Sequence, residues 1–265
     1  MDATDHEEQK RLELAVQAAL EAGRHTLRYF RRDDLVVNRK TDDSPVTIAD
    51  RDAEELLRRR IGETFPDDAI LGEEFPNIEG KSPFRWILDP IDGTKSFIHG
   101  VPLYSTLVAV ERDGEARIGV LVVPPLDEYV YARIGDGAWY VQGNASKRPA
   151  KVSQCAALEE SLFLTSEVEN FEKVGRHGLY LKLQERCRLS RSWGDGYGYL
   201  MLATGRAELM VDPIMASWDA GPLLPIMQEA GGTFTDWEGN ASIHSGNGFA
   251  TNGLIFDQVL EILRQ

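Results

Sequence analysis

The sequence predicts a mixed α and β protein in which helices pack on sheets. Two observations lead to this fold class: apolar side chains recur at helical spacing towards both ends of the chain, and short apolar runs typical of strands lie between them. The chain has 265 residues, of which 42% are hydrophobic, so it can bury a large core and is too apolar to be disordered. We identify no internal repeat, low-complexity tract or long linker.

Two helices are expected near the N-terminus. Residues 7–31 form an amphipathic pattern, with apolar side chains such as Leu12 on one face and charged side chains elsewhere. A second helix is expected to begin at Thr47 or Asp50, either of which can cap it, and to end before Pro66.

Six short apolar runs follow and predict strands. The pair Asp113-Gly114 lies between the third and fourth of these strands. It predicts a hairpin turn, because Asp and Gly accept a positive φ. The six runs cover residues 69–71, 86–88, 104–110, 118–123, 129–133 and 138–141.

Beyond residue 143 helical and strand patterns alternate. Pro222 and Pro225 fall within one helical pattern, where a proline tightens the first turn or kinks the second. We expect two tightly joined α/β halves, residues 1–147 and 148–265. The helical patterns cover residues 169–186, 196–204, 218–230 and 257–263, and the strand patterns cover residues 188–190 and 208–211.

The charge and the cysteine content exclude several classes of protein. With 29 Lys and Arg against 43 Asp and Glu, the formal charge is −14, which argues against a nucleic-acid partner. No apolar run reaches the roughly 18–20 residues that cross a bilayer, and the polar start does not resemble a signal peptide. The two cysteines, Cys155 and Cys187, exclude a disulfide framework. We therefore expect a cytoplasmic protein that binds no membrane.

The most informative segment carries two carboxylates beside a predicted helix start. A short apolar run delivers Asp89, and Pro90 is expected to end that strand in a turn that brings Asp92 to the same point. Gly93 permits close backbone approach, and Thr94 opens a short helix whose free N–H groups suit a phosphate. Because carboxylates repel phosphate, we expect divalent cations with oxygen ligands between them.

Three further acidic sites occur at similar places: Glu73 after a strand, Asp219 before a helix and Asp50 at a helix start. Each has an ordinary structural explanation, because Asp and Glu are common in turns, in solvated loops and at helix caps. Asp89 can likewise end a strand and Asp92 can belong to a turn. Taken together, the acidic sites favour a metal cluster over separate caps and turns.

These motifs resemble the inositol monophosphatase superfamily of magnesium-dependent, lithium-sensitive phosphatases. The matching stretches are Gly72-Glu-Glu, Trp86-Ile-Leu-Asp-Pro-Ile-Asp-Gly-Thr94, Trp218-Asp219 and Glu229-Ala-Gly-Gly232, in the same order and spacing. The resemblance implies a layered α-β-α-β-α sandwich, a homodimer and Mg²⁺-dependent hydrolysis of a small phosphate ester by metal-activated water. Residues 1–147 would supply most metal ligands, and residues 148–265 would supply Asp219 and the substrate-recognition residues.

The resemblance also implies roles for individual residues. Two or three Mg²⁺ ions are expected, and the amides of Gly93 and Thr94 would bind phosphate oxygens. Glu73 and Thr94 would orient the attacking water, with Asp50 close to a third, weaker ion. The implied metal ligands are Glu73, Asp89, the Ile91 carbonyl, Asp92 and Asp219.

Finer features resemble the histidinol-phosphate phosphatase branch of this superfamily. Two motifs of that branch match this chain: Thr94-Lys-Ser-Phe97 and Gly194-Asp-Gly-Tyr-Gly-Tyr199. The second departs at Gly196, where the branch has Cys. Ser217-Trp-Asp219 follows the inositol-enzyme form instead. L-histidinol phosphate is therefore the first choice of substrate, and inositol 1-phosphate is the alternative.

The substrate's leaving group is expected to contact the second half of the chain. Arg191, Asp195, Asp212 and Asp219 are the candidates, and an ammonium group would pair with Asp195 or Asp212. Asp195 could instead cap the following helix, and Asp212 could simply begin a turn.

Other phosphatase chemistries lack their residues. Neither cysteine has an arginine six residues later, as a cysteine phosphatase requires, and the chain has no P-loop or His-Glu-x-x-His motif. A non-catalytic metal-binding interaction protein of the same fold is the remote alternative.

Overall fold

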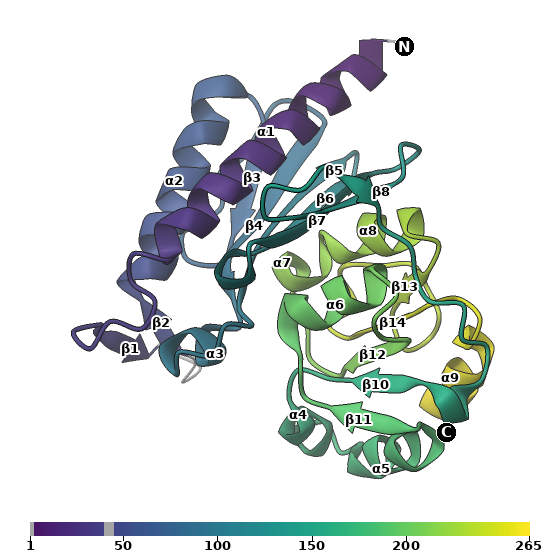
Figure 1. The fold of residues 1–265 in the computed structure, drawn as a ribbon. Coiled ribbons are helices and arrows are strands. Elements are labelled where there is room, and N and C mark those ends of the chain that lie inside the picture. The colour runs from purple at the N-terminus through teal and green to yellow at the C-terminus, as the bar shows by residue number, and fades with distance from the viewer. Residues whose placement is uncertain (1–2, 40–44) are drawn as a thin grey trace.

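The computed structural model describes residues 3–39 and 45–265, and two large sheets dominate it (Figure 1). The first has seven strands in the order β3-β4-β5-β6-β7-β8-β9, antiparallel except for the parallel pair β3 and β4. Its strands are β3 (Ala69–Gly72), β4 (Phe84–Asp92), β5 (Ser105–Arg112), β6 (Glu115–Val123), β7 (Glu128–Arg133), β8 (Ala138–Gln142) and β9 (Arg148–Pro149).

The second sheet has five strands in the order β11-β10-β12-β14-β13. Strands β11, β10 and β12 are parallel, and β14 runs antiparallel to its two neighbours. These strands are β10 (Leu162–Leu164), β11 (Leu189–Arg191), β12 (Leu209–Asp212), β13 (Thr233–Thr235) and β14 (Gly248–Thr251). A separate two-stranded ribbon pairs β1 (Val37–Arg39) with β2 (Pro45–Thr47).

Helices form three layers around the two sheets (Figure 1). Helices α1 (Ala3–Thr26) and α2 (Ile48–Thr64) pack on the outer face of the first sheet, and α6 (Asp195–Ala203), α7 (Ser217–Ala220) and α8 (Leu223–Glu229) lie between the sheets. Helices α4 (Val168–Lys173), α5 (His177–Arg186) and α9 (Phe256–Leu263) cover the far face of the second sheet. The expected α-β-α-β-α sandwich is confirmed. The remaining short elements are α3 (Thr94–Ile98), η1 (Pro124–Leu126) and η2 (Leu158–Glu160).

The layer between the sheets joins them into one continuous core. Leu107 of β5, Leu223 of α8 and Met210 of β12 belong to the same buried cluster. Because helices cover both faces of the first sheet, β5 is buried along nearly its whole length instead of alternating.

Several predicted elements need correction. Helix α1 ends at Thr26, five residues earlier than expected, and the Thr26 hydroxyl donates to the Gly23 carbonyl. The pattern over residues 169–186 is two helices, because the chain turns at Gly175 with a φ of 72°. The pattern over residues 218–230 is also two helices, α7 and α8, which separate at Pro222. The Asp113-Gly114 turn is confirmed, with φ values of 53° and 83°.

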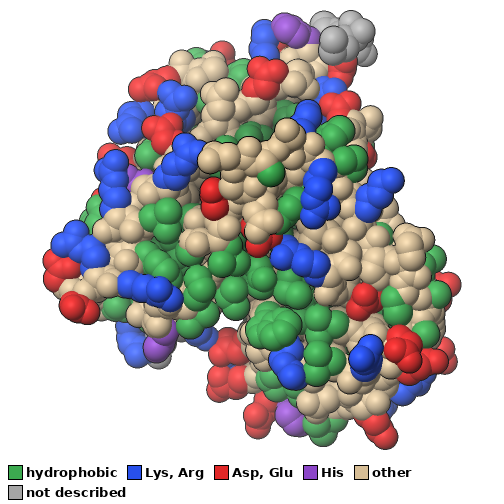
Figure 2. Space-filling view, viewed as in Figure 1, with side chains coloured by type: hydrophobic (Ala, Val, Ile, Leu, Met, Phe, Trp, Pro, Cys, Tyr) green, Lys and Arg blue, Asp and Glu red, His purple; other side chains and the backbone are tan. Residues whose placement is uncertain are grey.

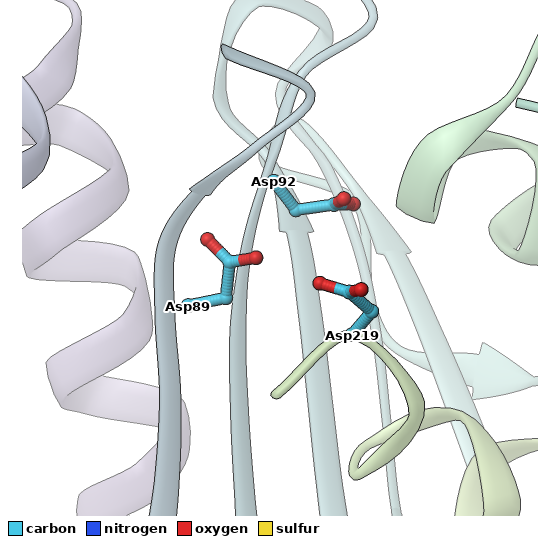
Figure 3. Close-up of side chains that lie close together, drawn as sticks. All are labelled: Asp89, Asp92 and Asp219. Carbon is cyan, nitrogen blue, oxygen red and sulfur yellow. The ribbon is translucent and has the colours of Figure 1, made fainter. Parts of the chain in front are cut away.

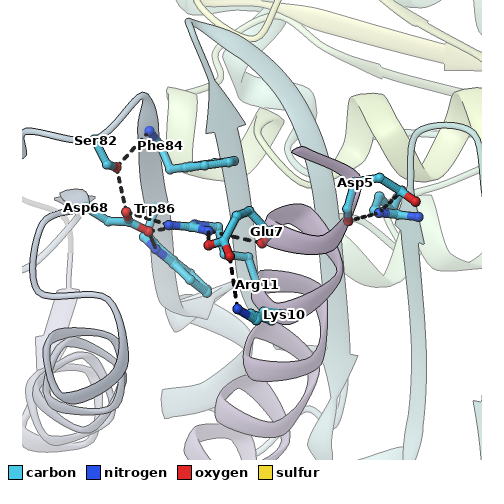
Figure 4. Close-up of polar contacts among 9 residues, drawn as sticks. Asp5, Glu7, Lys10, Arg11, Asp68, Ser82, Phe84 and Trp86 are labelled. Atoms are coloured by element: carbon cyan, nitrogen blue, oxygen red, sulfur yellow. Dashed lines mark hydrogen bonds and ion pairs between the residues drawn. The ribbon is translucent and has the colours of Figure 1, made fainter. Parts of the chain in front are cut away.

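A buried ion pair ties α1 to the first sheet (Figure 4). Arg11 donates to both carboxylate oxygens of Asp68, over 2.8 and 2.9 Å. Asp68 also accepts from Trp86 Nε1 at 2.8 Å and from Ser82 Oγ at 2.6 Å. The Arg11 guanidinium lies 3.6 Å from the centre of the Phe84 ring. Every strong polar group of this cluster therefore has a partner.

One face of the molecule is apolar in its middle. Figure 2 shows hydrophobic side chains gathered there, with charged side chains mostly around them. Apolar surface of this kind favours contact with another protein, and the homodimer expected from the sequence stays a prediction.

Candidate active site

Three carboxylates meet where α7 packs against β4. Asp89 and Asp92 come from β4 and Asp219 comes from α7, and each offers an oxygen within 4.8 Å of the other two. Figure 3 shows the three side chains converging on one space. The packing of the layer between the sheets thus brings Asp219 to two acids that lie more than 120 residues earlier in the chain.

The strand carrying Asp89 and Asp92 is irregular between them. The expectation that Pro90 ends this strand is wrong. Strand β4 continues to Asp92, which pairs with Ser105, and the register shifts after Asp89. Residues three apart in a regular strand point to opposite faces, and a bulge reverses that alternation. The irregularity therefore lets Asp89 and Asp92 share one site.

The crowding of these acids changes their protonation. Burial raises the pKa of Asp89 well above its ordinary value, and the charges of Glu73 and Asp92 raise it further. Burial also raises the pKa of Asp92 to about 6, against hydrogen bonds that lower it. The pKa of Asp219 rises to about 8, through burial first and then the charge of Asp92.

The same residues fit a divalent metal. Asp89 Oδ1 is buried and has no hydrogen-bond partner among the residues that the structure describes. A buried acceptor without a partner is costly, and a cation would satisfy it. Carboxylate oxygens are the donors that hard cations such as Mg²⁺ and Ca²⁺ prefer, so the donor set suits such an ion.

A pH-dependent stability follows from these shifts. An acid whose pKa is raised by folding holds more protons in the folded than in the unfolded protein, so the metal-free protein loses stability as pH rises through the folded pKa values. We expect its melting temperature in EDTA to fall between pH 6 and pH 8, and Mg²⁺ to raise it more at pH 8 than at pH 6. Thermal melts of wild type and Asp219→Asn test this; a slope that the variant does not flatten would contradict it.

Asp50 and Thr94 lie beside the carboxylates. Thr47, not Asp50, caps α2, and Asp50 completes the capping box by accepting from the Thr47 amide at 2.8 Å. The Thr94 hydroxyl lies 3.3 Å from Asp50 Oδ1 and 3.1 Å from the Ile91 carbonyl oxygen. Asp50 is therefore both a capping residue and a neighbour of the predicted water-orienting Thr94.

Glu73 lies outside the group of three carboxylates found among the described residues, but it lines the same cavity as Asp92 and Asp219. Its charge raises the pKa of Asp89 and Asp92 in addition to their burial. It follows β3, at the end of a strand as the sequence predicts.

A buried glutamate of α2 holds the segment that carries Glu73. Glu54 accepts from the Glu74 amide at 2.8 Å and from Arg58 Nε at 2.7 Å. Arg58 also donates to the carbonyl oxygens of Phe75 and Pro76, each at a distance of 3.0 Å. The approach is so close that a Cβ on Gly72 would lie 2.1 Å from Glu54 Oε1.

The contacts of Glu54 and Arg58 with residues 74–76, here called the Glu54 clamp, were not predicted from the sequence. Its signal is an acid within a buried helix face: Glu54 precedes Ile61 by seven residues, two helical turns, and both are fully buried. A charged residue at such a position needs a specific partner.

Disturbing the clamp should weaken metal binding. Glu54→Gln loses the charge that holds Arg58, so we expect the dissociation constant for Mg²⁺ to rise by about 10-fold or more, as when other residues that orient metal ligands are replaced. Mg²⁺ titrations followed by calorimetry measure this, with exposed Glu55→Gln as the matched control. An unchanged Mg²⁺ affinity in Glu54→Gln would contradict the role.

Asp92 and Asp219 line a cavity of about 490 Å³ between the two sheets. One wall carries Gly93 and Thr94 at the start of α3, where Gly93 has a φ of 84°. Six acids line the cavity, and Lys95 is the one Lys or Arg among its described lining residues. The acids are Glu73, Asp92, Glu167, Asp195, Asp212 and Asp219.

Among the described residues that were predicted to contact the leaving group, Asp195 and Asp212 line the opposite wall of the cavity and Arg191 does not. Gly194 precedes α6 as its cap, so the alternative in which Asp195 caps the helix is not observed. Asp195 faces Gly93, where a Cβ would lie 2.7 Å from its Oδ2. Asp212 accepts from the Ser166 amide at 2.8 Å and the Tyr199 hydroxyl at 2.9 Å. Arg191 is exposed and is not among the described residues that line the cavity.

Gly196 has a structural reason to lack a side chain. Its amide and the Ser105 hydroxyl both donate to Asp92 Oδ2, the hydroxyl over 2.7 Å. A Cβ at Gly196 would lie 2.2 Å from Ser105 Oγ. Ser105 is a site residue that the sequence did not indicate.

Comparison with known proteins identifies the family. The model described as "Inositol monophosphatase family" matches residues 7–265. The chain belongs to this family. Members of the inositol monophosphatase family among its curated relatives include a histidinol-phosphatase of Chlorobaculum parvum, 44% identical over 91% of each chain. A histidinol-phosphatase of Streptomyces coelicolor is 36% identical over 96% of this chain and 97% of its own.

Solved inositol monophosphatase structures have the same fold. The Thermotoga maritima IMPase superposes with a TM-score of 0.84 at 33% identity, covering 96% of this chain and 97% of its own. The suhB protein of Bartonella henselae gives a TM-score of 0.87 at 30% identity, covering 97% and 99%. The chain is therefore a phosphoric monoester hydrolase of the inositol monophosphatase family. Among its described residues, no helix has the length and apolarity required to cross a bilayer.

Proposed function

We propose that this protein is a Mg²⁺-dependent histidinol-phosphatase, which hydrolyses L-histidinol phosphate to L-histidinol and inorganic phosphate. The observation that carries the choice of substrate is the cavity wall beyond the proposed metal ligands, where Glu167, Asp195 and Asp212 share one lysine, Lys95. An alcohol that bears an ammonium group suits this wall better than a neutral polyol. The two histidinol-phosphatase relatives support the same choice, whereas an inositol-1-monophosphatase of Rhizobium meliloti, 31% identical, supports the alternative substrate.

In the proposed site, two or three Mg²⁺ ions are held by Asp89, Asp92 and Asp219, with Glu73 and the Ile91 carbonyl completing the ligands. Bound Mg²⁺ supplies charge neutralisation and makes water a better nucleophile. The chain's own groups then act by positioning, which is most of what phosphoryl transfer requires.

Each remaining residue has a proposed part. The amides of Gly93 and Thr94 bind phosphate oxygens at the start of α3. Asp50 accepts a hydrogen bond from the Thr94 hydroxyl, which leaves the hydroxyl oxygen free to accept from the attacking water, and Glu73 accepts a hydrogen bond from that water. Asp195 and Asp212 give the leaving-group wall its negative charge. A contact of Arg191 with substrate, inhibition by lithium and a cytoplasmic location stay predictions.

Phosphate release from a substrate panel tests the proposal. With Mg²⁺, we expect the highest kcat/KM for L-histidinol phosphate, a lower value for inositol 1-phosphate and no release in EDTA. A preference for inositol 1-phosphate would overturn the substrate while leaving the metal-dependent hydrolysis in place. Release that persists in EDTA would overturn the metal dependence.

A further inference from the structure

An ion pair joins the two walls of the cavity at its exposed edge. Lys95 Nζ lies 2.8 Å from each carboxylate oxygen of Glu167. Lys95 belongs to the first turn of α3, directly after Gly93 and Thr94, whereas Glu167 precedes α4. Both side chains line the cavity. The pair therefore connects the phosphate-binding wall to the wall that faces the leaving group.

Glu167 is the acid of the second wall that forms an ion pair with an exposed lysine. Asp212 already accepts from a backbone amide and from the buried Tyr199 hydroxyl, and Asp195 lies against Gly93. Glu167 instead holds Lys95, whose side chain is 62% exposed. Ion pairs with an exposed lysine are weak, because water and salt compete for both charges.

The Glu167 side chain is also free of a competing structural task. It occupies the position before α4 but makes no capping hydrogen bond to that helix. The Lys95 side chain spans the distance between the Glu167 carboxylate and the backbone of α3. The α3 residue at that point follows Gly93 and Thr94, whose amides are proposed to bind phosphate. An ammonium group a few bonds from a phosphate ester would reach the Glu167 carboxylate.

We propose that Glu167 is a specificity residue, which exchanges Lys95 for the cationic group of the substrate's alcohol. The inference rests on the proposed phosphatase function and names its substrate class: phosphomonoesters whose alcohol carries an ammonium group. The exchange replaces one charge-assisted contact by another, so only a cationic substrate gains from it. A neutral substrate leaves Glu167 with Lys95.

The ratio of two kcat/KM values tests this proposal. L-histidinol phosphate is compared with glycerol 2-phosphate, whose alcohol is neutral, for wild type and Glu167→Gln. The cationic-to-neutral ratio should fall at least about tenfold in Glu167→Gln, the usual effect of losing one hydrogen bond to a charged group. An unchanged ratio, or an equal loss with both substrates, would overturn the proposal.

Glu169→Gln is the matched control. Glu169 lies in α4, two residues after Glu167, pairs with Lys173 at 3.6 Å and is not among the described residues that line the cavity. It should keep the wild-type ratio, and a fall equal to that of Glu167→Gln would show a nonspecific charge effect and overturn the assignment to Glu167.

A binding measurement separates this inference from the proposed function. Calorimetry of L-histidinol with the Mg²⁺-loaded protein and inorganic phosphate reports recognition without turnover. If wild type fails to hydrolyse histidinol phosphate but binds L-histidinol about tenfold more tightly than Glu167→Gln, the proposed function is wrong and the role of Glu167 holds. If hydrolysis is efficient and binding does not change, the function holds and the role of Glu167 is wrong.

Discussion

Replacing Asp89 by asparagine is expected to abolish Mg²⁺-dependent phosphate release, with a fall in kcat of about 1,000-fold or more, the upper range for losing one preorganised electrostatic group. Asp89 is 2% exposed and is one of the three carboxylates that meet, with Oδ1 unpartnered among the described residues. An amide has nearly the same shape but no negative charge, so it binds Mg²⁺ poorly. Phosphate release at saturating Mg²⁺ measures the loss.

The fold should survive this substitution. Burial and neighbouring acids raise the pKa of Asp89, so a neutral side chain relieves repulsion in the metal-free protein. We expect the melting temperature of Asp89→Asn in EDTA to equal or exceed that of wild type. Asp113→Asn, in an exposed turn whose positive φ asparagine tolerates, is the control and should retain full activity. Near-wild-type turnover by Asp89→Asn would defeat the assignment of the site.

The contiguous parts of the fold could be predicted because their signals are local. The strand patterns of the first sheet, the Asp113-Gly114 turn and the start of α2 at Thr47 depend on residues close together in the chain. The register shift after Asp89 could not be predicted, because it depends on how β4 pairs with β5. Strands β10, β13 and β14 were not predicted, because three or four residues are too few for a pattern to separate a strand from a loop, although β11 and β12, of the same lengths, were predicted.

The acids of the candidate site could be predicted for a different reason: several carboxylates at strand and helix ends are hard to explain separately. The structure brings together Asp89, Asp92 and Asp219, as the sequence suggests. The groups that hold these acids were missed, because a hydrogen-bond partner has no sequence pattern of its own. Ser105 reads as an ordinary strand residue until its hydroxyl is seen to bond Asp92.

Loss of the buried pair of Arg11 and Asp68 is expected to have the largest effect on stability. Asp68→Ala would leave Arg11, a residue 5% exposed, between the Phe65 and Phe84 rings with the half-exposed Glu7, 3.1 Å away, as its remaining carboxylate. Removing one partner of a buried ion pair costs about 3–5 kcal/mol when the remaining charge is unpaired, so with the Glu7 contact kept we expect a cost of about 3 kcal/mol. Urea denaturation should therefore show a free energy of unfolding lower by that amount, with Lys10→Ala, from an exposed pair, changing it by less than about 1 kcal/mol.

The double variant Arg11→Met with Asp68→Asn distinguishes an unpaired charge from lost packing. Methionine keeps an apolar stem between the rings. Asparagine can accept from Trp86 with its amide oxygen, and its NH2 group can donate to the Ser82 hydroxyl, which now accepts. If the cost of Asp68→Ala comes from the unpaired guanidinium, the double variant should recover more than half of the lost stability, because no buried charge remains. If it is as unstable as Asp68→Ala, the ion pair is not the source of the effect, and the contacts of Arg11 with the aromatic rings would be the stabilising part of the cluster.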